Sequence, residues 1–446
     1  MMHNMPMIDS IFAKIRPFIP DAIFNFFNPI YHFKLALFGA IIYRFPSRKI
    51  KVIAVTGTKG KSSTVEILNA ILEEAGKKTA LTNTIRFKVG IESEPNLYKM
   101  SMPGRFFMQK FLRQAVDEHC DYAVLEMTSQ GAITYRNRFI DLDAFVFTNI
   151  SPEHIEAHGS YEKYRKAKLS IIEHGLVKSK KPSRIAIVNG DDPESQHFLD
   201  CIYGKYIKKK KFSLRDAEPY TIKNEGIDFT WCGKKASSQL SGLFNLYNIL
   251  AAATTAKNLG ISDEIIIGAI KRFNDIPGRV EKISAQKINP GAEDFTVVVD
   301  YAHTADSLEK LYKVFRPDPK APRSNRLFAV LGGTGGSRDH WKRSVMGKLA
   351  DTYCDEVILT DEDPYDEDQG QIVDDVSKGM TLKKPTVIMD RRLAIREAIV
   401  RAKKGDAVLI TGKGTDPFIM GPHGTKTPWS DANVAREELE NHARTS

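Results

Sequence analysis

Apolar residues recur along this chain in short runs that alternate with amphipathic stretches. The runs Val52-Ile53-Ala54-Val55 and 122–126 are typical of buried strands, whereas 62–75 repeats apolar residues at helical spacing. Between residues 50 and 277 the pattern predicts strands at 50–56, 122–126, 144–148 and 184–188, and helices at 62–75, 106–118, 161–173 and 246–259. Such alternation favours a mainly parallel sheet with helices on both faces.

A second alternation follows the break at Pro277-Gly278. Its predicted strands are 295–300, 327–331, 356–360 and 407–411, and its predicted helices are 305–315, 343–350 and 391–402. We therefore expect an α/β protein in three parts: a short hydrophobic N-terminal region (1–49), a central parallel-sheet domain (50–277) and a smaller, Rossmann-like C-terminal domain (278–446). Loops at the carboxyl ends of the parallel strands should carry the chemistry.

The first of these loops has the composition of a phosphate-binding loop. The first strand runs into Gly57-Thr58-Lys59-Gly60-Lys61-Ser62-Ser63, where a helix begins. Backbone N–H groups and a helix dipole then point at one spot, the lysine adds positive charge, and a serine hydroxyl can ligate Mg²⁺. The spacing between the glycines is two residues shorter than in the general P-loop pattern, so a plain glycine turn is the alternative. We interpret the segment as a P-loop-like nucleotide site.

Composition narrows the class of protein. Of 446 residues, 42% are hydrophobic and 27% charged, which is typical of a globular chain. The net charge is +10, but the sequence shows no stripe of basic residues interleaved with aromatic ones, as a nucleic-acid site would. The positive charge suits the binding of polyanionic small molecules instead. The widely spaced cysteines predict neither a zinc site nor disulfides, which fits a cytoplasmic protein; they are Cys120, Cys201, Cys232 and Cys354.

Residues 18–45 are rich in Phe, Ile and Leu. Their uncharged run from Leu35 to Tyr43 is nine residues long, too short for the ~20 that cross a bilayer. Two interpretations stay open: a small domain or helix pair packed on the body, or a peripheral anchor at the inner membrane face. In the second, the basic residues Arg44, Arg48, Lys49 and Lys51 would face anionic lipid.

Several further motifs follow the phosphate loop in a fixed order, and together they carry a family resemblance. From about Ile50 to Arg436 the chain resembles the Mur ligases, ATP-dependent amide-forming enzymes of cell-wall peptide synthesis. The later segments Gly335-Gly336-Ser337-Arg338-Asp339 and Gly412-Lys413-Gly414 look most like the MurE type. The earlier motifs are Leu125-Glu126-Met127, Thr148-Asn149-Ile150-Ser151-Pro152-Glu153-His154, Tyr164-Arg165-Lys166-Ala167-Lys168, Asn245-Leu246-Tyr247-Asn248, Pro277-Gly278-Arg279 and Asp300-Tyr301-Ala302-His303.

The resemblance implies a route through an acyl phosphate. A substrate carboxylate attacks the γ-phosphate of ATP, and an amine then displaces phosphate. Positive charge must neutralise the two anions that meet in the first step. Lys61 and the loop amides are implied to hold the phosphates, with Ser62 and Glu126 on one Mg²⁺ and His154 on a second.

The same resemblance implies further roles. Lys168 corresponds to a lysine that family members carry in carbamylated, metal-binding form; without the resemblance it would be a solvated helix lysine. Asn248 is implied to face adenine and Asp300 to bind ribose. Arg279 is implied to reach the γ-phosphate on domain closure, with His303 near the phosphates.

The amino-acid pocket departs from the pattern of the meso-diaminopimelate enzymes, which is Asp-Asn-Pro-Arg. Here the run is Glu362-Asp363-Pro364-Tyr365, so Tyr365 replaces the arginine that clasps a second carboxylate. A buried carboxylate without a cationic partner is costly, which argues against diaminopimelate. Nearby acids suit a side-chain ammonium, as in lysine or ornithine, unless the acidic run is a solvated loop. Asp416, which follows Gly412-Lys413-Gly414, is a further pocket residue, as are Arg338 and Asp339.

These features predict a monomeric ligase that adds an amino acid to a UDP-N-acetylmuramoyl-dipeptide. Only 49 residues precede Ile50, where ordinary members carry a domain for the uridine nucleotide. A lipid-linked or folate-like acceptor is therefore one alternative. A catalytically idle nucleotide-binding partner protein is another, and a transport or signalling ATPase is a third.

Overall fold

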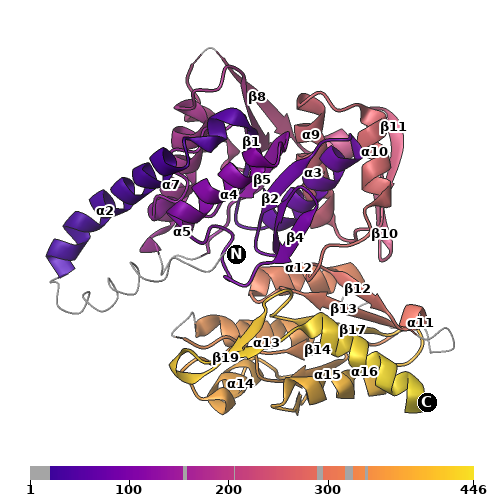
Figure 1. The fold of residues 1–446 in the computed structure, drawn as a ribbon. Helices are drawn as coiled ribbons and strands as arrows, with labels where there is room; N and C mark the ends of the chain where they lie inside the picture. The colour runs from indigo at the N-terminus through magenta and orange to yellow at the C-terminus, as the bar shows by residue number, and fades with distance from the viewer. Residues whose placement is uncertain are drawn as a thin grey trace.

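The computed structural model describes residues 21–153, 158–204, 206–288, 295–316, 325–336 and 340–445. Two large sheets dominate it, one above the other in Figure 1. We call the part built on the first sheet the central domain and the part built on the second the C-terminal domain.

The sheet of the central domain has the strand order β4-β3-β2-β5-β1-β6-β7-β8. The strands from β2 to β8 in this order run parallel, and β3 and β4 add an antiparallel edge. Their bounds are β1 Lys51–Thr56, β2 Thr79–Thr82, β3 Arg86–Val89, β4 Glu92–Pro95, β5 Tyr122–Glu126, β6 Ala144–Phe147, β7 Arg184–Asn189 and β8 Ile207–Phe212.

Helices cover both faces of this sheet, as the alternating pattern predicts. Side chains of β1 point alternately into two cores, with Ile53 and Val55 in one and Val52 and Ala54 in the other. The first core also contains α3 Lys61–Glu74, α9 Leu243–Asn258 and α10 Asp263–Arg272, with a small antiparallel sheet of β9 Thr221–Lys223, β10 Gly226–Trp231 and β11 Lys234–Ser238. The second contains α4 Arg105–Asp117, α5 Ser129–Ile133, α7 Tyr161–Ile171 and α8 Ser195–Asp200.

The C-terminal domain has the strand order β12-β13-β17-β14-β15-β16, parallel except for β12. The strands are β12 Glu281–Ser284, β13 Thr296–Asp300, β14 Leu327–Leu331, β15 Glu356–Leu359, β16 Thr386–Val387 and β17 Ala407–Thr411. One face packs on α12 Ala305–Phe315, α13 Trp341–Tyr353 and α14 Gln369–Ser377, the other on α15 Arg391–Arg401 and α16 Asp431–Thr445. A hairpin of β18 Phe418–Met420 and β19 Lys426–Pro428 lies beside the sheet. The predicted α/β class is confirmed.

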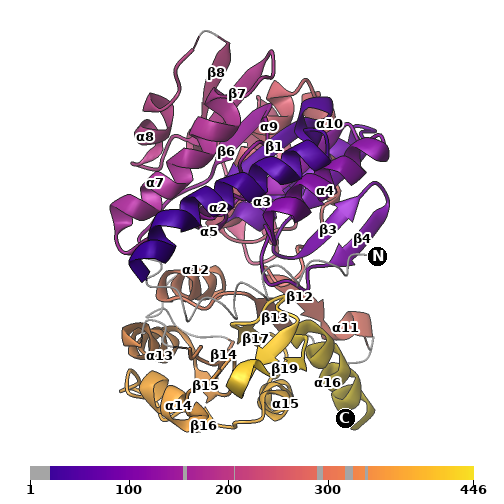
Figure 2. The same ribbon diagram turned by 60° about the vertical axis from the view of Figure 1, so that its left-hand side comes forward.

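The described part of the N-terminal region forms the long helix α2 Asp21–Ile42, followed by a short 3-10 helix, Pro46–Lys49, where a helix pair was one expectation. Helix α2 runs beside α4 over the front of the central domain in Figure 2, and Pro29 lies within it. Ala36 and Ala40 are buried, whereas Phe38, Ile41 and Ile42 are exposed. Among the described residues, no helix combines the length and apolar character that crossing a bilayer requires.

Some predicted elements need correction. The segment predicted as a helix at 161–173 leaves α-helical geometry after Ile171 and continues as a π-helical turn, Ile172–Val177. The strands β2, β3 and β4 and the small sheet of β9 to β11 were not predicted, because these short segments lack the continuous apolar runs of the predicted strands. The lysines at 208–211 are exposed on the edge strand β8, where like charges discourage pairing with another chain.

Candidate active site

The phosphate loop joins β1 to α3, and the loop after β6 holds it in place. The carbonyl oxygen of Asn149 accepts a hydrogen bond from the backbone N–H group of Thr58 (2.8 Å). Oδ1 of the same asparagine accepts one from the backbone N–H group of Lys59 (2.9 Å). A Cβ atom at Gly57 would collide with the Thr148 hydroxyl, so glycine is required there. The loop is thus shaped by two strand ends, and it presents the first N–H groups of α3, which no preceding helical turn satisfies.

Lys61 and Asn248 flank this loop. Lys61 Nζ donates to the Thr58 carbonyl oxygen (2.9 Å), and burial lowers the pKa of its ammonium group while Glu126 opposes the shift. Asn248 is buried on α9 against Gly60, whose φ of +79° and lack of a side chain permit the contact. Asn245 accepts a hydrogen bond from Asn248 Nδ2 (3.1 Å). These contacts fix the lysine and the asparagine at the loop in advance of any ligand.

A buried carboxylate lies at the end of the neighbouring strand β5. Glu126 Oε2 accepts from the Ser62 hydroxyl (2.6 Å) and from the Thr84 backbone N–H (3.1 Å), and Oε1 accepts from the Thr84 hydroxyl (3.0 Å). A hydroxyl and a carboxylate beside a phosphate loop are oxygen ligands of the kind that Mg²⁺ prefers. This pair therefore fits the predicted metal. Within the described residues, no group of three or more His, Cys, Asp or Glu side chains could hold a metal on its own.

Lys168 of α7 is brought to the same loop from more than a hundred residues away in sequence. Its side chain is only 2% exposed, and Nζ donates to the Gly57 carbonyl oxygen (2.6 Å) and lies 4.8 Å from the centre of the Tyr164 ring. Burial, reinforced by the charge of Lys61, lowers the pKa of this amine well below its usual value. A lysine so placed is an uncharged nucleophile over a wider pH range than a solvated one.

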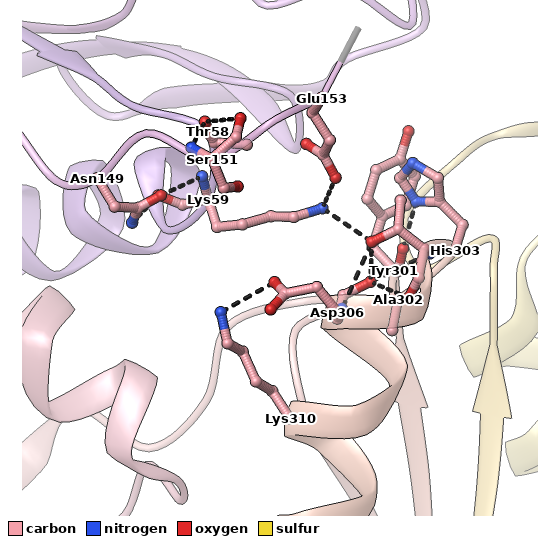
Figure 3. Close-up of polar contacts among 12 residues, drawn as sticks. Thr58, Lys59, Asn149, Ser151, Glu153, Tyr301, Ala302, His303, Asp306 and Lys310 are labelled. Atoms are coloured by element: carbon pink, nitrogen blue, oxygen red, sulfur yellow. Dashed lines mark hydrogen bonds and ion pairs between the residues drawn. The ribbon is translucent and has the colours of Figure 1, made fainter. Parts of the chain in front are cut away.

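Lys59 bridges the phosphate loop to the C-terminal domain, as Figure 3 shows. Its Nζ lies 2.5 Å from Oε1 of Glu153 and donates to the Thr304 hydroxyl (3.2 Å), which caps the N-terminus of α12. His303 Nδ1 lies 2.7 Å from the Tyr301 carbonyl oxygen, and burial with the nearby charge of Lys59 lowers the pKa of the imidazole to about 3. The N-terminus of α12 thus faces the phosphate loop, with His303 neutral at physiological pH.

The hinge between the domains is held by Asp300. Its carboxylate accepts from the backbone N–H groups of Val280 (2.7 Å) and Ala302 (2.7 Å), and burial raises its pKa against the influence of Arg279. The Arg279 guanidinium stacks 4.4 Å from the Tyr301 ring centre, and its charge contributes to the lowered pKa of Lys61. Asp300 therefore organises the backbone at the start of the C-terminal domain, and the charge of Arg279 acts on Lys61 of the phosphate loop.

The predicted amino-acid pocket joins two loops of the C-terminal domain. Buried Lys413 Nζ lies 2.7 Å from Asp363 Oδ1 and 3.3 Å from Asp416 Oδ2. Tyr365, at a φ of +53°, packs beside Gly336. The structure thus brings Asp363 and Asp416 together. The predicted site residues His154, Arg338 and Asp339 lie outside the described residues.

Several contributors escaped the sequence prediction. Thr84 follows β2, and a correct prediction of that strand would have pointed to it, since ligand-binding residues follow parallel strands. Lys413 belongs to the motif Gly412-Lys413-Gly414, but the sequence predicted no role for its side chain. Lys99 comes from the loop after β4 and reaches the acids of the C-terminal domain, with no local pattern to indicate it.

Comparison with known proteins gives the same assignment. Residues 55–256 match the Mur ligase middle domain, and residues 278–414 match the Mur ligase, glutamate ligase domain. A UDP-N-acetylmuramyl-tripeptide synthetase of Roseiflexus sp. strain RS-1 is 35% identical over 91% of this chain and 81% of its own. The chain belongs to the Mur ligase family. Members of this family are ATP-dependent amide ligases, so the predicted enzyme class is confirmed.

Other relatives and solved structures agree. A UDP-N-acetylmuramoyl-L-alanyl-D-glutamate–2,6-diaminopimelate ligase of Geobacillus kaustophilus is 35% identical over 86% of this chain and 78% of its own. The structure of a ligase of that name, 26% identical, superposes with a TM-score of 0.60 over 88% of this chain and 78% of its own. A Mycobacterium tuberculosis folylpolyglutamate synthase superposes with a TM-score of 0.67 at 15% identity, over 86% of this chain and 93% of its own, and so shares the fold.

Proposed function

We propose that this Mur ligase uses ATP and Mg²⁺ to join an amino acid to a UDP-N-acetylmuramoyl-dipeptide in the cytoplasm, acting as a monomer. The observation that carries the proposal is the buried amine of Lys168, hydrogen-bonded to the phosphate loop beside the Ser62–Glu126 pair. A loop that only bound nucleotide would have no need of a desolvated amine at this position. Relatives whose names specify this reaction match most of the chain.

In this proposal the described residues divide the chemistry between two domains. The loop from Gly57 to Ser63 and Lys61 hold the phosphates, and Asn248 lies beside the nucleotide. Ser62 and Glu126 would hold one Mg²⁺, and a carbamate formed on Lys168 would supply a further oxygen ligand for metal. An uncharged amine forms a carbamate by attack of its lone pair on CO₂ with loss of one proton, and the lowered pKa of Lys168 favours that uncharged form. From the other domain, Arg279, Asp300 and His303 complete the nucleotide site.

For the incoming amino acid we propose lysine or ornithine in preference to diaminopimelate. Asp363 and Asp416 offer carboxylates to an ammonium group, and among the described residues two lysines already pair with them: Lys413, within 3.3 Å of both, and Lys99, 2.8 Å from Asp416 and 3.6 Å from Asp363. Tyr365 stands where the diaminopimelate enzymes carry arginine. A second substrate carboxylate would meet no free cation among the described pocket residues, at a cost that an ammonium avoids.

Product analysis tests this function. The chain is incubated with ATP, Mg²⁺, the UDP-muramoyl-dipeptide and each amino acid, and phosphate release is measured alongside product mass. We expect one phosphate per amide bond, with lysine or ornithine preferred, and no product from Lys61→Met. Phosphate release without an amine would indicate a simple ATPase, whereas no release with any acceptor would indicate an idle nucleotide-binding protein. Diaminopimelate as the preferred substrate would contradict the assignment of the pocket.

We also propose that α2 attaches the enzyme to anionic membrane surfaces at the inner membrane face. Its exposed stripe includes Phe38 (57% exposed) and Ile42 (60%), and the exposed Arg44 and Lys49 follow it directly. Apolar and basic side chains on one helix end favour the lipid interface. In vesicle flotation, the Phe38→Ser, Ile42→Ser variant should lose binding to anionic vesicles. The control Ile91→Ser, at a 92% exposed turn between β3 and β4, should not; equal flotation of all three proteins would contradict the proposal.

A further inference from the structure

Lys99 carries an ammonium group from the central domain into the amino-acid pocket of the C-terminal domain. Its Nζ lies 2.8 Å from Oδ2 of Asp416 and 3.6 Å from Oδ2 of Asp363. These are the two carboxylates proposed above to receive the incoming amino acid. A cation of the chain therefore stands where an ammonium of the substrate would stand.

The charges of the pocket leave room for one such cation. Among the three groups joined by direct ion pairs, Asp363 and Asp416 contribute two negative charges, and the buried Lys413 contributes one positive charge fixed between them. One negative charge remains, and Lys99 balances it. A buried site with an unbalanced charge is unfavourable, so the pocket favours one further ammonium, from Lys99 or from a ligand.

The space in the pocket makes the two occupants exclusive. The cavity that remains beside Lys99 is about 20 Å³ and is lined by Thr84, Asn96, Lys99, Tyr301, Thr415, Asp416 and Pro417. That volume holds about one water molecule. An amino acid bound on this side of Asp416 would therefore overlap the Lys99 side chain.

Lys99 is the more exposed of the two lysines that pair with the pocket acids. Its side chain is 22% exposed, against 1% for Lys413, so its contacts are partly open to solvent and to a competing amine. Its backbone has a φ of +55°, a conformation that costs free energy for a residue with a side chain. Lys413, in contrast, is buried and belongs to the same loop as Asp416.

We propose that Lys99 is a specificity-determining residue, a tethered ammonium that the amino-acid substrate must displace from Asp363 and Asp416. This inference rests on the proposed ligase function. The apparent affinity of a competing amine equals its intrinsic affinity multiplied by the fraction of time that the site is free. A site that is free about one tenth of the time therefore binds the amine about tenfold more weakly. Amines that bind these carboxylates less strongly than Lys99 are thereby rejected.

Titration calorimetry with lysine, ornithine, diaminopimelate and alanine tests the competition directly. Lys99→Met should bind the preferred amino acid about three- to tenfold more tightly than the wild type. Lys99→Arg, which keeps the positive charge, should resemble the wild type. Lys78→Met is the matched control, because Lys78 pairs with Glu118 on the surface of the same domain; it should leave the affinity unchanged.

Kinetics separates competition from a structural role. In Lys99→Met the KM for the amino acid should fall by the same factor, with the KM for ATP unchanged. The proposal is wrong if no amino acid of the panel binds more tightly to Lys99→Met, or if the KM for the amino acid rises, since Lys99 would then hold the substrate. If Lys99→Met binds an amino acid more tightly but the wild type forms no amide, the ligase function is wrong. The competition between Lys99 and the amino acid would then still hold.

Discussion

The amine of Lys168 owes its expected reactivity to its surroundings. A lysine on a helix surface stays protonated at neutral pH, whereas burial against Tyr164 and the proximity of Lys61 favour the neutral form here. The hydrogen bond to the Gly57 carbonyl oxygen holds the amine at the phosphate loop. One side chain is thus both desolvated and aimed at the nucleotide site.

Removing this amine tests its role. Lys168→Ala should lower turnover by at least about a hundredfold, as losses of groups that stabilise charge in a transition state do, and short carboxylic acids should restore part of it by replacing the carbamate. The control is Lys166→Ala, an exposed lysine on the same helix. Steady-state ligase assays measure both, and full activity of Lys168→Ala would exclude a metal-binding carbamate.

Glu362 makes stability depend on pH. Its Oε1 accepts from the Thr334 hydroxyl (2.9 Å), and its buried Oε2 has no hydrogen-bond partner among the residues that the structure describes. Burial raises its pKa from 4.5 to about 7. Between these values the folded state holds a proton that the unfolded state has lost, so the stability gained from this proton falls as pH rises toward 7.

A neutral replacement should remove that dependence. Glu362→Gln should be more stable than the wild type at pH 8, by up to about 3 kcal/mol, and about equally stable at pH 5. Thermal unfolding midpoints at the two pH values measure the difference. Asp366→Asn, at an exposed carboxylate nearby, should show no such pH-dependent gain; a gain at pH 5 equal to that at pH 8 would contradict the raised pKa.

At the scale of elements, the hinge at Gly278 depends on the absence of a side chain. Its φ is +62°, and a Cβ atom would lie 2.5 Å from the Thr415 backbone nitrogen and 2.6 Å from the Gly414 carbonyl carbon. Two loops far apart in sequence therefore meet at backbone distance. The hinge and the loop that carries Asp416 are positioned as one unit.

Alanine at this position should disturb the site as well as the backbone. Gly278→Ala should lower kcat/KM by at least about tenfold, because displacing a site by about 1 Å is costly in catalysis. Gly260→Ala is the matched control: its φ is +91°, but nothing lies within 4 Å of an added Cβ. It should lose stability of about 1 kcal/mol and keep its activity. Equal kinetics of the two variants would contradict a positioning role for the hinge.

For the whole molecule, two lysines of the central domain reach across to the C-terminal domain. Lys59 contacts Thr304, and Lys99 contacts Asp416. In the view of Figure 1, α12 lies at the top of the C-terminal domain, toward the central domain, and Thr304 begins this helix. Electrostatic contacts therefore help to hold the two domains together.

The contact between the domains should accordingly be sensitive to salt. Between about 0.1 M and about 1 M salt the Debye length falls from about 10 Å to about 3 Å, so partly exposed pairs weaken. The radius of gyration from X-ray scattering should rise with salt in the wild type. The Lys59→Met, Lys99→Met variant should be expanded already at low salt. The control variant Lys78→Met, Lys310→Met removes two ion pairs that lie within single domains, and it should behave as the wild type. If the variant Lys59→Met, Lys99→Met is not expanded, these two lysines do not hold the domains together.

The sequence by itself determined the elements whose signal is local. The β1–loop–α3 unit is contiguous, and apolar periodicity placed β5, α12, β14 and β17 at their observed bounds. The motifs identified the family, because the residues that carry it lie at strand ends that the sequence already marks.

Tertiary structure alone decided the contacts between distant residues. The burial of Lys168 against Gly57, the approach of Thr84 to Glu126 and the insertion of Lys99 between Asp363 and Asp416 each join segments separated by many residues. The physical reason is that burial and charge neutralisation act through space. A lysine's local sequence is the same whether it faces water or a pair of carboxylates, and only the packed fold determines which.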